Sequence, residues 1–434
     1  MNMAANRWQK SFGKIALAIA AVTLTVTFAL AQDTPRGEGR GRGGQRGNQT
    51  LSETAQKMIA ELPLTPLTKD RDGNFRIAPP YTDDPAFTVK EGVPKGKVVR
   101  FVMNSADSKI FPTAPPRGGR GARGGRGGRR GGGEQAAGER GAGERGANEQ
   151  SAAQQPATTQ PTTTTPPTSE QPAAEQQAPQ PITFERPVAV YIPAGYVPGT
   201  PTPFIVVMDG VRGFTQTDPP NPEGRNAFVP EMLDNLIHEK RVPSMVAIMI
   251  DPGPGGQRTI EYDTVSDKYT MFIENEVLPK ISKDYNITFT KDPEGRAAMG
   301  ESSGAACALA MAWFHPELYR RVLTYSGTFV RLGQRNEIAP NGAWDYHATL
   351  IPNSEKKPLR IWLHVGDRDN GFNSDEEGMR NWVTAQFHMA RVLKEKGYPY
   401  QFVLADNSGH VDNDVERQTL PSAFEWLWAG YKAQ

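Results

Sequence analysis

The chain has 434 residues, of which 49 are Lys or Arg and 48 are Asp or Glu, so its formal net charge is +1. A balance this even provides no overall field that would attract nucleic acid or a membrane surface. The single cysteine, Cys307, excludes a framework of disulfide bonds. No group of His, Asp and Glu residues has the spacing of a metal-ligand set, and we expect neither a metal nor a cofactor.

Residues 1–31 have the anatomy of a secretory signal peptide. Basic residues stand at the start (Arg7, Lys10 and Lys14), an apolar run covers 15–30, and a small-x-small cleavage site ends at Ala31. We therefore expect cleavage near Ala31, a periplasmic or extracellular mature protein, and no membrane contact after cleavage. An uncleaved membrane anchor is the alternative.

Two low-complexity tracts interrupt the chain, an Arg/Gly-rich tract at 32–50 and a longer tract at 113–180 that begins with Arg-Gly repeats and ends in Gln, Pro, Thr and Ala. Neither has enough large apolar residues to offset the entropy lost on ordering, so both are predicted to be disordered. They also lack interleaved aromatic residues that would stack on bases, which argues against a nucleic-acid partner. Between them, residues 51–94 are predicted to form an N-terminal arm with one amphipathic helix that packs on the main domain.

The main domain is predicted to be split into residues 95–112 and 181–434. Residues 96–103 and 186–193 both read as strands. If these strands pair, the tract at 113–180 is an insertion in the loop between them. A surface loop tolerates such an insertion because the entropy of loop closure grows only logarithmically with length.

Further along the chain, short apolar runs alternate with segments of helical periodicity. Strands are predicted at 204–208, 245–250, 296–299, 322–326, 359–366 and 400–404, and helices at 230–239, about 265–285, 303–314, 382–396 and 420–431. This alternation predicts an α/β fold, with a mainly parallel sheet covered by helices on both faces. Functional residues in such a sheet lie beyond the carboxyl ends of the strands.

The motif Gly300-Glu301-Ser302-Ser303-Gly304 follows one of these strands and begins a helix. Gly-x-Ser-x-Gly at a strand-to-helix turn exposes the serine hydroxyl, and the glycines are needed because a side chain would collide with the tight turn. We therefore predict that Ser302 is a nucleophile. Glu301 is interpreted either as a wall of the site or as a surface residue.

The acid and the histidine that complete a catalytic triad are predicted from their order along the chain, which in this architecture is Ser, Asp or Glu, then His. Asp369 follows a late strand and is the preferred acid, and Asp367 is the alternative. His410, in a loop after the last strand, is preferred to His388, which lies within a predicted helix. The N–H groups of Ser303 and Val211 are predicted to form the oxyanion hole.

Several passages together resemble the putative esterase family of α/β-hydrolases, the esterase D-like group that includes enterochelin esterases and feruloyl or acetylxylan esterases. The passages are Tyr191 to Tyr196, Asp209-Gly210, Asp251-Pro252-Gly253, the Gly-Glu-Ser-Ser-Gly motif and the late Gly409-His410. Asn235-Leu236-Ile237 and Arg258-x-x-Glu261-Tyr262-Asp263 are most similar to the enterochelin esterase-like branch. The resemblance covers about 95–103 and 182–428. It implies an α/β-hydrolase fold and cofactor-free hydrolysis of a small-molecule or glycan-linked ester.

The sequence leaves the substrate open between a siderophore ester and feruloyl or acetyl groups on plant polysaccharide. Arg258 is a candidate to bind an anionic or phenolate group, but an ion pair with Glu261 is the preferred interpretation. Trp382 is a candidate to line an acyl or aryl pocket, but a role in the core is the preferred interpretation. A non-catalytic binding protein on the same fold is the rival hypothesis. The oligomeric state is not determined by the sequence.

Overall fold

The computed structural model describes residues 50–115, 180–215 and 228–432. The chain divides into residues 1–49 and 50–434, and every described residue belongs to the second unit. The predicted signal peptide (1–31), the Arg/Gly tract (32–50) and the low-complexity insertion (113–180) lie outside the described residues, apart from Thr50, residues 113–115 and Gln180. Within the described residues, no helix combines the length and the apolar character that crossing a membrane requires.

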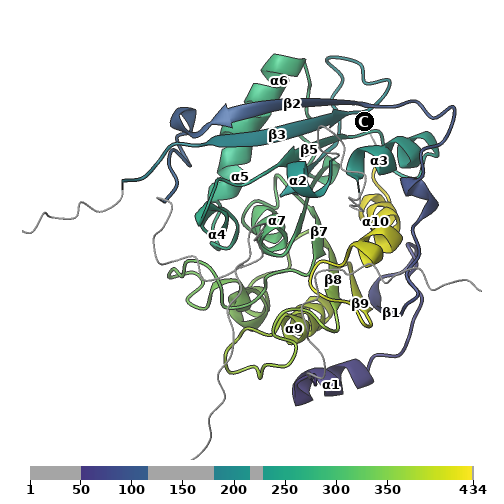
Figure 1. The fold of residues 1–434 in the computed structure, drawn as a ribbon, viewed down its shortest axis with the longest axis vertical. Coiled ribbons are helices and arrows are strands. Elements are labelled where there is room, and N and C mark those ends of the chain that lie inside the picture. The colour runs from purple at the N-terminus through teal and green to yellow at the C-terminus, as the bar shows by residue number, and fades with distance from the viewer. Residues whose placement is uncertain (1–49, 116–179, 216–227, 433–434) are drawn as a thin grey trace, which may run out of the picture. The chain divides into compact units, whose positions relative to one another are not determined.

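One mixed sheet organises the second unit, and its nine strands in the described ranges run in the order β1-β9-β8-β7-β6-β4-β5-β3-β2 (Figure 1). Neighbouring strands are parallel except for the pairs β2–β3 and β3–β5. The strands are β1 (Gly73–Ile77), β2 (Lys97–Asn104), β3 (Glu185–Ile192), β4 (Phe204–Met208), β5 (Val246–Ile250), β6 (Arg296–Glu301), β7 (Arg321–Tyr325), β8 (Arg360–Gly366) and β9 (Tyr400–Ala405).

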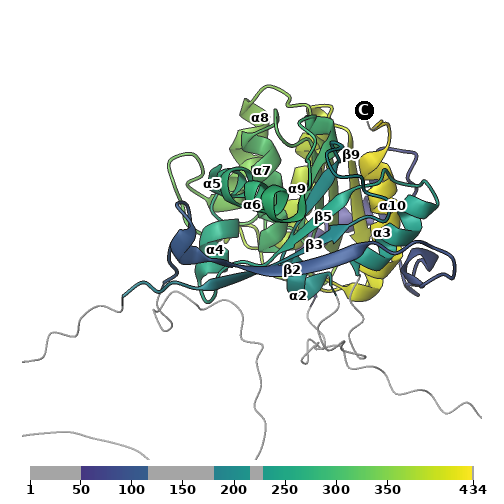
Figure 2. The same ribbon diagram turned by 90° about the horizontal axis from the view of Figure 1, so that it is seen from above.

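Helices cover both faces of this sheet, which confirms the predicted fold class (Figure 2). The first face carries α1 (Glu53–Ala60), α4 (Gln257–Tyr262), α5 (Lys268–Phe272), α6 (Leu278–Tyr285), α7 (Ser303–Phe314), α8 (Ile351–Asn353) and α9 (Trp382–Glu395), and the second carries α3 (Val229–His238) and α10 (Asn413–Trp428). The short α2 (Gly210–Gly213) follows β4.

Burial on both faces explains why the central strands are continuous apolar runs. In β4, Phe204, Val206 and Met208 belong to the core on the first face, whereas Ile205 and Val207 belong to the core on the second. All five residues of this strand are fully buried.

The predicted hairpin between the first two strands of the main domain is confirmed. β2 and β3 pair antiparallel from Lys97↔Ile192 to Asn104↔Glu185. The chain between them contains residues 116–179, so the low-complexity tract connects two adjacent strands of one sheet.

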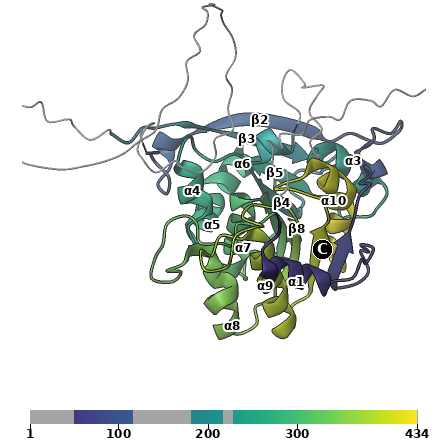
Figure 3. The ribbon, with the colours of Figure 1, turned by 60° about the horizontal axis from the view of Figure 1, so that its bottom comes forward.

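The N-terminal arm contributes more than the predicted helix. β1 lies at the sheet edge and pairs in parallel with β9, from Gly73↔Gln401 to Ile77↔Ala405. Arg76 anchors this edge, since its Nε lies 2.9 Å from Oδ1 of Asp406. The helix α1 packs beside α9 (Figure 3), and Ser52 N–H donates to Phe372 O at 3.0 Å.

Three helices differ from the prediction. The segment around Arg258, for which no helix was predicted, forms the short helix α4. The helix predicted at about 265–285 is α5 and α6 joined by a π-turn at Ile273–Val277, because the ring of Pro279 cannot continue a regular helix. α10 begins at Asn413 instead of residue 420, since the Asp412 carboxylate caps it by accepting from Asp414 N–H at 3.0 Å.

Candidate functional site

Ser302 stands at the turn between β6 and α7 with φ 54° and ψ −120°, a strained conformation for a residue other than glycine. A Cβ added to Gly300 would lie 2.3 Å from the backbone carbon of Gly304, so only glycine fits there. The turn is held from β7, because Ser302 N–H donates to Tyr325 O at 2.9 Å. The local sequence therefore forms the sharp strand-to-helix turn that the motif predicts.

His410 joins two of the predicted residues. Its Nε2 lies 2.9 Å from Ser302 Oγ, and its Nδ1 lies 2.6 Å from Asp369 Oδ1. The Asp369 side chain is fully buried, whereas 24% of the His410 side chain is exposed. A buried carboxylate on Nδ1 favours the tautomer in which Nε2 faces the serine as an acceptor.

The alternative acid and the alternative histidine both have other partners. Asp367 accepts a hydrogen bond from Ser408 N–H at 3.2 Å and so holds the loop that carries His410. His388 lies on α9, where its Nε2 is 2.7 Å from Glu376 Oε1. The structure thus brings together Ser302, His410 and Asp369.

Two residues that the sequence did not single out complete the surroundings of the nucleophile. Thr328 Oγ1 lies 3.4 Å from Ser302 Oγ, and Thr328 N–H donates to Ser302 O at 3.0 Å. Ser326 Oγ accepts from Val411 N–H at 3.0 Å, next to His410. Both follow β7, and their sequence signal is only that they come after a strand end, which many residues share.

The predicted oxyanion hole is altered at one position. Ser303 is the first residue of α7, so its N–H has no acceptor within the helix. Val211 differs, because its N–H donates to Asp251 Oδ1 at 3.0 Å. The prediction that Val211 offers a free donor was wrong. Asp251 follows the neighbouring strand β5 and also binds Arg212 through Nε at 2.7 Å, so it anchors the start of α2.

The ion pair predicted between Arg258 and Glu261 was also wrong. Arg258 forms a two-point pair with Asp209, with Nη2 2.6 Å from Oδ2 and Nε 3.2 Å from Oδ1. Glu261 instead binds Arg186 at 2.6 Å through each of its oxygens. Both residues lie on α4, but Glu261 points toward Arg186 on β3, whereas Arg258 extends to the end of β4. Arg258 also donates to Glu301 O at 3.3 Å.

Trp382 lies at the start of α9 beside the histidine. It is 9% exposed, and its ring centroid is 6.1 Å from that of His410 in an edge-on arrangement. The residue therefore contributes to the core and also forms part of the wall next to His410.

Two carboxyl groups next to the nucleophile turn have raised pKa values, those of Asp263 and Glu301. Burial raises the pKa of Asp263 to about 6, although the side chains of Ser303 and Thr259 oppose part of that rise. Glu301, next to the nucleophile, is partly exposed, and burial of its carboxyl raises the pKa of that group to about 7. Its backbone O accepts from Arg258 at 3.3 Å, so Glu301 is a component of the site.

No group of three or more His, Cys, Asp or Glu side chains in the described ranges is arranged to hold a metal.

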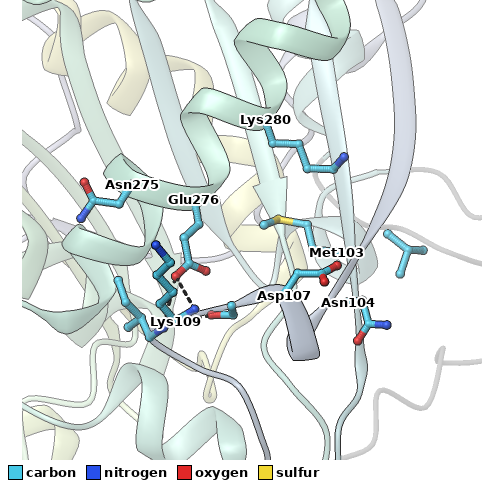
Figure 4. Close-up of a pocket in the computed structure, with 10 residues that line it drawn as sticks. Met103, Asn104, Asp107, Lys109, Asn275, Glu276 and Lys280 are labelled. Carbon is cyan, nitrogen blue, oxygen red and sulfur yellow. Dashed lines mark hydrogen bonds between the residues drawn. The ribbon is translucent and has the colours of Figure 1, made fainter.

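A cavity of about 680 Å³ lies between β2 and the helical segment that contains the π-turn at Ile273–Val277, and none of the predicted site residues lines it. In Figure 4, Glu276 points toward the backbone at Lys109, whose N–H donates to Glu276 Oε1 at 2.9 Å. That carboxylate is used to fasten the chain after β2.

Comparison with known proteins identifies a family for this chain. A family model described as putative esterase matches residues 181–414. No similar sequence is found among curated proteins.

Similar solved structures include an enterochelin esterase from Shigella flexneri, with 22% identity and a TM-score of 0.43 over 56% of this chain and 55% of that chain. A ferulic acid esterase matches with 19% identity and a TM-score of 0.42, over 56% of this chain and 93% of that chain. A ferulic acid esterase from Anaeromyces mucronatus, solved in complex with ferulic acid, has 15% identity and a TM-score of 0.38 over 56% and 85%. The chain spans about half the length of the enterochelin esterase.

Proposed function

Because this chain belongs to the putative esterase family, we propose that it hydrolyses carboxylic esters through an acyl-enzyme formed on Ser302. The observation that carries the proposal is the hydrogen-bonded series from Ser302 Oγ through His410 to the buried Asp369. A non-catalytic binding protein has no need for a strained serine with a histidine 2.9 Å from its hydroxyl.

In the proposed reaction, His410 Nε2 takes the Ser302 proton as Oγ attacks the ester carbonyl. His410 then protonates the departing alcohol, and a water molecule repeats the sequence to release the acid. Asp369 holds the imidazole tautomer and stabilises the imidazolium. The carbonyl oxygen gains negative charge near the N-terminus of α7, where the N–H of Ser303 is available to it.

The substrate is proposed to be an ester of the kind cleaved by the enterochelin esterase-like branch, as the sequence resemblance implies. The second candidate is a feruloyl or acetyl ester on plant polysaccharide. Trp382 supports an aromatic acyl group, because its ring borders His410. Asp209 neutralises Arg258, which weakens the case for an anionic group bound there. A periplasmic or extracellular location is part of the proposal and rests on residues 1–31.

The decisive test is hydrolysis of p-nitrophenyl acetate and butyrate by the mature protein and by Ser302→Ala. We expect the substitution to lower kcat by several orders of magnitude, because it removes the nucleophile. Ser374→Ala, at an exposed serine, is the matched control and should leave the rate unchanged.

Labelling with a fluorophosphonate probe separates a selective esterase from an inactive protein. The proposal requires Ser302 to be labelled in the wild type and in Ser374→Ala, but no label in Ser302→Ala. Absence of both labelling and turnover in the wild type would overturn it and favour a binding protein.

A further inference from the structure

Residues 325–328 run past the nucleophile, from the end of β7 into the following loop. They hold the Ser302 backbone at two points, because Ser302 N–H donates to Tyr325 O at 2.9 Å and Thr328 N–H donates to Ser302 O at 3.0 Å. The position of the nucleophile is therefore tied to this segment, and Ser326 lies between the two contacts.

Ser326 joins the segment to the loop that carries the histidine. Its Oγ accepts from Val411 N–H at 3.0 Å, one residue after His410, and its own N–H donates to His364 O on β8 at 3.0 Å. Ser326 is fully buried, so it does not touch a substrate. A single serine thus fixes the chain next to the histidine relative to the chain that holds the nucleophile.

Val411 needs such a contact because its backbone is strained. Its φ is 54°, in the left-handed region that a β-branched side chain rarely adopts. Without an opposing interaction the residue would relax toward negative φ. The resulting displacement would fall on His410, because on the other side of Val411 the chain is fixed by Asp412, which caps α10.

We propose that Ser326 is a positioning residue for His410. The hydrogen bond to its Oγ keeps Val411 in the left-handed conformation, and this conformation directs the imidazole at Ser302. His410 is then held from both sides, since the carboxylate of Asp367 fixes the loop just before it. The inference rests on the proposed function, because the 2.9 Å distance between His410 Nε2 and Ser302 Oγ affects a rate only if the histidine takes the serine proton.

The first experiment measures kcat and KM for p-nitrophenyl butyrate in the wild type, Ser326→Ala and Ser105→Ala. Ser105 is the matched control, because it is also a buried serine whose Oγ accepts from a backbone N–H, that of Phe184, at 2.8 Å. Ser326→Ala should lower kcat by about 10- to 100-fold and leave KM within about twofold, because a displaced base slows proton transfer without touching the substrate.

The control separates positioning from a general loss of stability. Urea unfolding should show a lower midpoint for both serine variants, because each loses a buried hydrogen bond. Only Ser326→Ala should lose activity in the folded state. A wild-type kcat in Ser326→Ala, or an equal loss of kcat in Ser105→Ala, would overturn the proposal.

The second experiment tests the link through Val411. Asparagine adopts the left-handed conformation more readily than valine, so Val411→Asn should keep the backbone in place without help from Ser326. Combined with Val411→Asn, Ser326→Ala should therefore cost less than about threefold in kcat. Val411→Thr retains the β-branch, and in that background Ser326→Ala should cause its full loss. Equal losses in the two backgrounds would overturn the link.

The third experiment needs no turnover. The proton on His410 Nδ1, in the hydrogen bond to Asp369, is observed by NMR at low field and is assigned by its absence in His410→Gln. We expect Ser326→Ala to lose or shift this signal, because the imidazole no longer stays aligned with the carboxylate, and Ser105→Ala to leave it unchanged.

An unchanged signal in Ser326→Ala would overturn the inference even if the enzyme is active. An inactive wild type in which Ser326→Ala still changes the signal would instead overturn the proposed function and leave the positioning contact intact.

Discussion

Asp369 Oδ1 lies 2.6 Å from His410 Nδ1, whereas Asp367, two residues earlier, accepts from Ser408 N–H. Both aspartates follow β8 in one tight loop, but they serve different segments. Asp369 reaches the imidazole and Asp367 holds the backbone just before it. This division of roles leads to a prediction that separates the two candidate acids.

Asp369→Asn should lower kcat by about three to four orders of magnitude, because an amide stabilises the wrong histidine tautomer. Asp367→Asn should cost no more than about tenfold, since it weakens a single hydrogen bond to the loop. Steady-state kinetics on p-nitrophenyl butyrate measures both. Equal losses in the two variants would contradict the assignment of the acid.

Double-mutant cycles on the free energy of unfolding should show that Arg258 is paired with Asp209 and not with Glu261. The coupling energy between Arg258→Gln and Asp209→Asn is expected to be about 1–2 kcal/mol, because the two side chains share a two-point ion pair that is partly exposed. The cycle of Arg258→Gln with Glu261→Gln should give a coupling near zero. Urea unfolding monitored by fluorescence gives both values.

Glu261→Gln on its own should be severely destabilising, by about 3–5 kcal/mol, because it leaves the buried Arg186 without a counter-charge. The loss should exceed that for Arg258→Gln, whose side chain is 33% exposed. A smaller loss for Glu261→Gln than for Arg258→Gln would indicate that the Arg186 pair is not formed as described.

Asp263 makes the free energy of unfolding depend on pH. Burial raises the pKa of its carboxyl to about 6 in the folded protein, above its ordinary value, so the native state binds more protons than the unfolded state between about pH 4 and pH 6. Stability from this group is therefore fully present below about pH 4 and is lost as the pH rises through about 6.

Asp263→Asn removes that dependence. Relative to the wild type, the variant should gain about 1–3 kcal/mol of stability between pH 4 and pH 7.5. Urea unfolding at several pH values measures the difference, and Asp375→Asn, at an exposed position, is the control. A constant difference across this pH range would show that Asp263 is not held neutral by burial.

The edge strand β1 should be essential to the fold. Phe75 is fully buried in the core on the α10 face, so Phe75→Ala should cost about 3–5 kcal/mol. Leu64→Ala in the same arm should cost less than about 0.5 kcal/mol, because Leu64 is 62% exposed. Thermal melts of the two variants would test whether the arm is part of the cooperative unit.

The sequence by itself determined the elements whose signals are local. The apolar runs at Phe204–Met208 and Val246–Ile250 predict buried parallel strands, because a strand covered on both faces must be apolar throughout. The motif around Ser302 predicts its turn, since the backbone of Gly304 lies so close to Gly300 that only glycine fits at position 300. The order of Asp369 and His410 after it follows from the architecture, although the sequence alone left Asp367 open.

Only the tertiary structure decided the relationships between distant segments. The strand β1 depends on β9 for its partner, and its five residues, with Phe75 at the centre and Arg76 beside it, have no strong strand signal of their own. The partners of Arg258 and Val211 depend on where neighbouring strands end, because β4 and β5 place Asp209 and Asp251 within reach of them. Local propensity acts over a few residues, whereas charges and hydrogen bonds select partners only after the chain has brought them together.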